Sequence, residues 1–103
     1  MSRRVSNLAF NREFPAASGL TGIPKENQVR IARDRTNPFD SDAVGVWLDG
    51  YPAVPMGWLY RKDANRDAVL TKLASGGEMK GHIELVQRRP GGRDPQKVVV
   101  FWL

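Results

Sequence analysis

Short segments with the two-residue period of β-strands, each bounded by Gly, Pro, Asn or Asp, constrain this chain most. Val29 and Ile31 alternate with Arg30, and a run of apolar residues covers 98–102. The pair Asp49–Gly50 is typical of a tight turn between two such segments. We expect six strands, over residues 8–14, 28–34, 43–48, 54–60, 79–87 and 97–103.

One helix is expected between the fourth and fifth strands. Asp63 is a good capping residue, Val69, Leu70 and Leu73 form an apolar stripe, and Gly76 follows, so the helix should run from 63 to about 74. The fold class is therefore mainly β, a small six-stranded OB-like or SH3-like barrel with one main helix after the fourth strand. Residues 1–7 lack periodicity and predict a flexible tail before a domain over 8–103, with a loop at 15–25 and a turn at 90–92.

Composition narrows the chemistry available. The 103 residues fit one domain, and the absence of Cys excludes disulfides and thiolate metal sites. The single histidine, His82, cannot build a zinc site by itself, so we expect no cofactor. Neither a secretory signal nor an apolar stretch of about 20 residues is apparent, which predicts a cytoplasmic protein that does not enter membranes.

Charge is unevenly distributed along the chain. Sixteen Lys and Arg against eleven Asp and Glu give a net charge of +5. Residues 1–35 carry a net +4, residues 36–60 a net −3 and residues 61–103 a net +4. Basic segments of this kind often contact phosphate, although solubility alone would also explain them.

The acidic middle segment contains an unusual loop. Asn37–Pro38 favours a turn, and it is followed by an aromatic residue, Phe39, and an acidic one, Asp40. Phe39 could stack on a nucleobase while Asp40 accepts a hydrogen bond from a sugar hydroxyl. Alternatively, Phe39 plugs the barrel mouth and Asp40 caps the turn. Asp40 and Asp42 could also share a cation, but hydrogen bonding within the turn is the simpler role.

Residues 33–46, Arg-Asp-Arg-Thr-Asn-Pro-Phe-Asp-Ser-Asp-Ala-Val-Gly-Val, resemble the signature of the HIRAN domain family. Residues 56–61, Ala64 and residues 100–102 match later parts of the same pattern, so the resemblance covers about residues 8–103. It implies a small OB-related barrel that captures the 3′ end of single-stranded DNA. A helicase or nuclease on a separate chain would then be a possible partner.

The resemblance also implies roles for individual residues. Phe39 would lie against the terminal base, Asp40 would bind the 3′-hydroxyl, and Asn37 would shape the loop. Phosphates would be neutralised by basic side chains, and Trp58 would stack or pack. The remaining candidates are Arg33, Arg61 and Lys62 for phosphate, and Arg12 and Phe14, separated by Glu13, for the grip of the first strand.

Two other functions without catalysis remain open from the sequence. A protein-interaction domain would use Trp58, Trp102 or a free edge of the last strand to dock on a separate DNA-processing enzyme. A generic single-strand binder would show no preference for ends. A nuclease would need Asp40, Asp42 and Asp49 to hold magnesium, and their spacing gives no independent support for that reaction. We therefore expect no enzyme.

Overall fold

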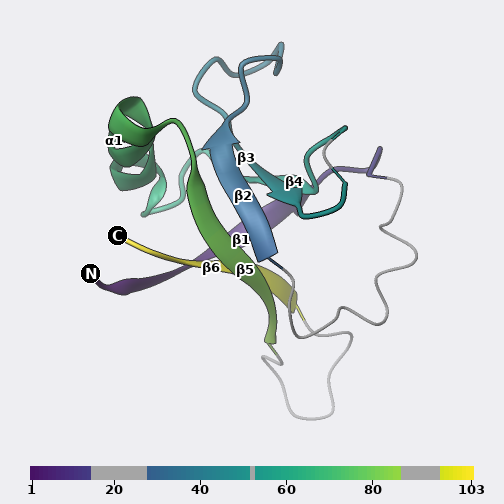
Figure 1. Cartoon of the computed structure of the whole chain (residues 1–103). Coiled ribbons are helices and arrows are strands. Elements are labelled where there is room, and N and C mark those ends of the chain that lie inside the picture. The colour runs from purple at the N-terminus through teal and green to yellow at the C-terminus, as the bar shows by residue number, and fades with distance from the viewer. Residues whose placement is uncertain (15–27, 52, 87–95) are drawn as a thin grey trace.

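The strands of this chain close into one antiparallel barrel, seen in a computed structural model that describes residues 1–14, 28–51, 53–86 and 96–103. Neighbouring strands follow the order β1-β4-β3-β2-β5-β6 (Figure 1). The predicted six-stranded, OB-like β barrel with one helix after the fourth strand is confirmed. The elements are β1 (Arg3–Phe10), β2 (Gln28–Arg33), β3 (Val44–Leu48), β4 (Gly57–Leu59), α1 (Arg66–Gly76), β5 (Met79–Val86) and β6 (Gln96–Trp102).

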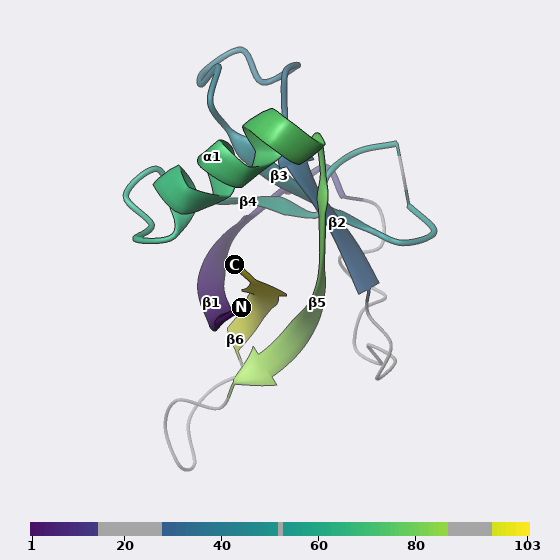
Figure 2. The same ribbon diagram turned by 60° about the vertical axis from the view of Figure 1, so that its left-hand side comes forward.

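Alternation along the strands fills the barrel. Ile31, Val46 and Phe101 come from three different strands and are almost wholly buried in one apolar cluster. Val69 and Leu73, one helical turn apart on α1, join the same cluster, so α1 closes one end of the barrel. Figures 1 and 2 show α1 at the same end as the loop between β2 and β3, which places that loop beside the helix.

The first strand begins earlier than the sequence predicted, and the expected flexible tail at residues 1–7 is wrong. Arg3 to Asn7 pair with Trp102 to Val98 of β6. The backbone ladder therefore orders a polar stretch that shows no hydrophobic period. The inward-facing Ser6 hydroxyl is also satisfied, because it donates to Asp63 at 2.9 Å.

The other element boundaries shift for local reasons. The fourth strand was predicted from residue 54 but begins at Gly57, after Pro55, which has no N–H to donate to a ladder. Gly57 lies so close to β1 that a Cβ atom there would be 2.6 Å from the Ala9 carbonyl oxygen. The helix begins at Arg66 rather than 63, because the Asp63 carboxylate accepts the Asn65 N–H and helical geometry begins only after that turn.

Closure of the barrel leaves the last strand without the free edge that the protein-interaction alternative could have used. β6 pairs with β1 on one side and β5 on the other. The loop expected at 15–25 and the turn expected at 90–92 lie outside the described residues. Among the helices that the structure describes, none combines the length and the apolar character needed to cross a membrane.

Candidate nucleic-acid interface

The loop between β2 and β3 is braced by its own side chains. The Asn37 Oδ1 atom accepts the backbone N–H groups of Phe39 at 2.8 Å and Asp40 at 3.2 Å. The Asp40 Oδ1 atom in turn accepts the N–H of Asp42 at 3.0 Å. Such side-chain-to-backbone bonds form the turn that Asn-Pro sequences favour, so the tip of the loop has one defined conformation.

Phe39 stands at this tip almost unprotected. The residue is 85% exposed, whereas Phe101 in the barrel is fully buried. An exposed phenyl ring on a braced loop loses the burial that would otherwise stabilise it. The interpretation in which Phe39 plugs the barrel mouth is therefore wrong, and the ring is available to a ligand.

Asp40 lies next to Phe39 and faces two arginines. Its Oδ2 atom is 2.8 Å from Arg66 Nη2 and 3.3 Å from Arg61 Nε, and Arg61 also donates to the Phe39 carbonyl at 2.6 Å. The pKa of Asp40 lies below its ordinary value of 3.8, chiefly because its carboxylate accepts the Asp42 N–H. Partial burial raises this pKa, while the guanidinium groups of Arg66 and Arg61 lower it. This carboxylate is thus ionised at neutral pH and tied into the loop.

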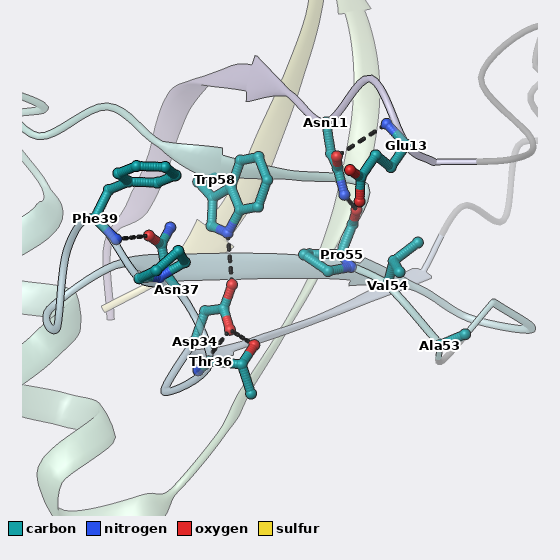
Figure 3. A pocket seen from close by; sticks show the side chains of 11 residues that line it. Asn11, Glu13, Asp34, Thr36, Asn37, Phe39, Ala53, Val54, Pro55 and Trp58 are labelled. Atoms are coloured by element: carbon teal, nitrogen blue, oxygen red, sulfur yellow. Dashed lines mark hydrogen bonds between the residues drawn. The ribbon is translucent and has the colours of Figure 1, made fainter.

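Asp34, at the start of the same loop, has neutral partners. Its Oδ2 atom accepts the Trp58 indole N–H at 2.8 Å, and its Oδ1 atom accepts the Thr36 N–H and hydroxyl at 3.2 and 2.7 Å. Asp34 is only 5% exposed. These bonds fix the plane and position of the Trp58 ring relative to the loop (Figure 3).

A pocket of about 460 Å³ opens between Phe39 and Trp58. Figure 3 shows Phe39 and Asn37 at one end of it and the Glu13 side chain at the other. In the described part of the chain, its walls combine six apolar or aromatic residues with five polar ones, two of which are acidic. The lining residues are Asn11, Glu13, Asp34, Thr36, Asn37, Pro38, Phe39, Ala53, Val54, Pro55 and Trp58.

Only part of the predicted site comes together at this pocket. Asn37, Phe39 and Trp58 line it, while Asp40 and Arg61 do not and are paired with each other.

The other four candidates are placed differently. Lys62 and Arg12 are exposed, and Arg33 pairs with Asp42 beside a second pocket of about 330 Å³ against α1. The predicted role of Phe14 in gripping DNA is wrong, because Phe14 is 2% exposed and packs edge-on against Tyr51, with ring centroids 5.6 Å apart. It belongs to the core and cannot stack on a base.

Sequence reasoning missed four residues of this site. Arg66 was assigned only to a helix, and Asp34 was only part of the motif. Asn11 and Glu13 were expected in a strand, but Asn11 Oδ1 accepts the Glu13 N–H at 3.0 Å and forms a turn. The pair Asn-x-Glu after a strand is a turn signal that would have removed residues 11–14 from the strand.

The two loop carboxylates considered for a metal have other partners. Asp42 pairs with Arg33, and Asp40 pairs with Arg66. Within the described ranges, no group of three or more His, Asp or Glu side chains is positioned to hold a metal ion.

Comparison of the chain with protein-family models, with curated proteins and with solved structures finds no match. The functional proposal therefore depends on the geometry of the loop and pocket.

Proposed function

We propose that this chain is a non-enzymatic module that binds single-stranded DNA and captures its 3′-hydroxyl end. The observation that carries the proposal is Phe39, an aromatic residue that is 85% exposed on a braced loop and lines one end of a pocket. The resemblance of residues 33–46 to the HIRAN signature supports the same function. We propose membership of that family on this basis.

Phe39 would bind the terminal base by stacking. Aromatic stacking contributes about 1–3 kcal/mol per base and tolerates any base, since each has a π face. The Asn37 bonds to Phe39 and Asp40 already order the loop. Little conformational entropy would then be lost when a base arrives.

Asp40 would recognise the free hydroxyl. A carboxylate offers about four acceptor positions. Within the described residues, Arg66, Arg61 and the Asp42 N–H occupy three of them. The fourth suits a hydroxyl donor, whereas a phosphate at the same place would meet a negative charge. Asp40 would therefore distinguish a 3′-hydroxyl from a phosphate by repelling the phosphate as well as by binding the hydroxyl.

Basic side chains outside the pocket would bind the phosphates of the DNA backbone. Arg61 is 67% exposed on its side chain, and Lys62 beside it is also exposed. Such groups neutralise phosphates without reading sequence. Binding should therefore weaken linearly in the logarithm of salt concentration.

Fluorescence anisotropy with a short labelled single strand tests this function. We expect the strand with a 3′-hydroxyl to bind about tenfold or more tightly than the same strand with a 3′-phosphate, with salt weakening both. Asp40→Asn should abolish most of this preference, while the exposed Asp49→Asn should keep it. Equal affinity for both ends would indicate a generic single-strand binder, and no binding at low salt would refute nucleic-acid binding.

A second candidate is docking of a protein partner on the outside of the barrel. Val5 and Trp102, which lie on the neighbouring strands β1 and β6, are 42% and 40% exposed. An apolar contact at these residues would change little with salt, which separates it from phosphate binding.

A further inference from the structure

The pocket beside Phe39 is acidic, although the protein as a whole carries a net charge of +5. Glu13 and Asp34 contribute carboxylates to its lining, and the described residues that line it include no Lys, Arg or His. Phosphate groups are therefore repelled from this space, while groups that donate hydrogen bonds are favoured. If the proposed function holds, the base enters the pocket and the backbone stays outside.

Most polar groups in the lining already have partners. Asp34 accepts three bonds, from Trp58 and twice from Thr36. The Asn11 amide accepts the Glu13 N–H at 3.0 Å and donates to the Pro55 carbonyl at 2.8 Å. These bonds satisfy the buried groups and leave them little capacity for a ligand.

Two polar groups of the lining lack a partner in the part of the chain that the structure describes: the Asn37 Nδ2 amide, at the Phe39 end, and the Glu13 carboxylate. Glu13 is the charged one of the two, and no described hydrogen-bond or ion-pair partner meets its carboxylate. Its backbone N–H is held by Asn11, so the residue is positioned, while no other described side chain or backbone group binds its carboxylate. Figure 3 shows this side chain at the opposite end of the pocket from Phe39 and on the same side of the cavity as Asn11.

We propose that Glu13 selects the 3′-terminal base, and that it favours guanine. This inference rests on the proposed capture of a DNA end. A base that lies along Phe39 and Trp58 would direct its Watson–Crick edge toward the far end of the pocket, and unpaired bases are commonly read at that edge.

The hydrogen-bond donors on the Watson–Crick edge of each base decide the expected order of affinity for the Glu13 carboxylate. Guanine presents a ring N–H and an amino group side by side, which match the two oxygens of one carboxylate. Adenine and cytosine present one amino group next to a ring nitrogen acceptor, which repels the second oxygen. Thymine presents a single N–H between two carbonyls and should bind least well.

Two strands that differ by one amino group test the proposal. One ends in deoxyguanosine and the other in deoxyinosine, and both carry a 3′-hydroxyl. The guanine strand should bind about tenfold more tightly to the wild-type protein, because a charge-assisted hydrogen bond is lost with inosine. Glu13→Ala should bring the ratio close to one. Glu78→Ala removes an acid that bridges to Arg30 outside the pocket and should leave the ratio unchanged.

The outcomes separate this inference from the function on which it rests. Tight and equal binding of both strands to the wild-type protein would overturn base selection and leave end capture standing. A guanine preference that persists in Glu13→Ala would overturn the assignment to Glu13. If neither strand binds, end capture is refuted together with base selection.

Discussion

Two of the three aspartates in the loop between β2 and β3, Asp34 and Asp40, have different surroundings. Asp34, 5% exposed, accepts only neutral donors and lines the pocket. Asp40, whose side chain is 19% exposed, does not line the pocket and faces Arg66 of α1 and the exposed Arg61. Asp34 therefore builds the wall that holds Trp58, whereas Asp40 places a charge at the tip. Within one loop, the donors around a carboxylate decide whether it serves structure or recognition.

Removing the buried aspartate should have the largest effect. Asp34→Ala leaves the Trp58 indole N–H and the Thr36 N–H without their acceptor, so the free energy of unfolding should fall by about 2–3 kcal/mol. Equilibrium unfolding in urea measures this change in the free energy of unfolding. Asp49→Ala, an exposed aspartate in a turn, should change stability by less than about 0.5 kcal/mol. A loss equally small for Asp34→Ala would contradict the structural role assigned to Asp34.

Phe39→Ala should separate binding from stability. Phe39 is 85% exposed, so removal of its ring should leave the unfolding midpoint unchanged. Loss of one stacking contact should weaken single-strand binding by about 1–2 kcal/mol, or roughly tenfold, by anisotropy. Trp102→Ala, on the outside of the barrel, is the matched aromatic control and should bind normally. Unchanged affinity in Phe39→Ala would exclude stacking at the loop.

Arg61→Ala tests the charged side of the loop. Because Arg61 is exposed, the variant should fold with nearly wild-type stability. The slope of log affinity against log salt should decrease by about one, as expected for one lost phosphate contact. Arg3→Ala, which removes a surface partner of Glu84, should retain the wild-type slope. Equal slopes for all three proteins would place the DNA backbone elsewhere.

Acid should erase the small contribution of Asp40 to stability. Its folded-state pKa is lowered, so this contribution is complete above the ordinary value of 3.8 and is lost as the pH falls through the lower folded-state value. The difference in Tm between the wild type and Asp40→Asn should therefore narrow below pH 4. A difference that stays constant from pH 6 to pH 3 would contradict the ion pairs with Arg61 and Arg66.

The fold was largely readable from the sequence because alternation at Val29 and Ile31 and the stripe of Val69 and Leu73 each specify a buried face. The N-terminal part of β1 was not readable. Its polar residues gain their order from the backbone ladder with β6, which leaves no hydrophobic pattern.

The candidate site could be predicted from the sequence only where its contacts join residues that are close together in the chain. The turn made by Asn37 and the exposure of Phe39 arise within a few residues. Asp34 and Trp58 are 24 residues apart, and Arg66 and Asp40 are 26 apart, so only the closed barrel brings each pair together. Phe14 was misassigned because an apolar residue after a strand has the same pattern whether it turns into the core or toward a ligand.

The most direct test of end capture is a ¹⁵N NMR titration that follows the indole N–H of each of the three tryptophans, Trp47, Trp58 and Trp102, with the backbone amides of Phe39 and Asp40. A strand ending in a 3′-hydroxyl should shift Trp58, Phe39 and Asp40 while Trp47 and Trp102 stay in place. The 3′-phosphate strand should produce much smaller shifts at equal concentration. Shifts confined to Trp47 or Trp102, or identical shifts with both strands, would contradict capture of the DNA end at this loop.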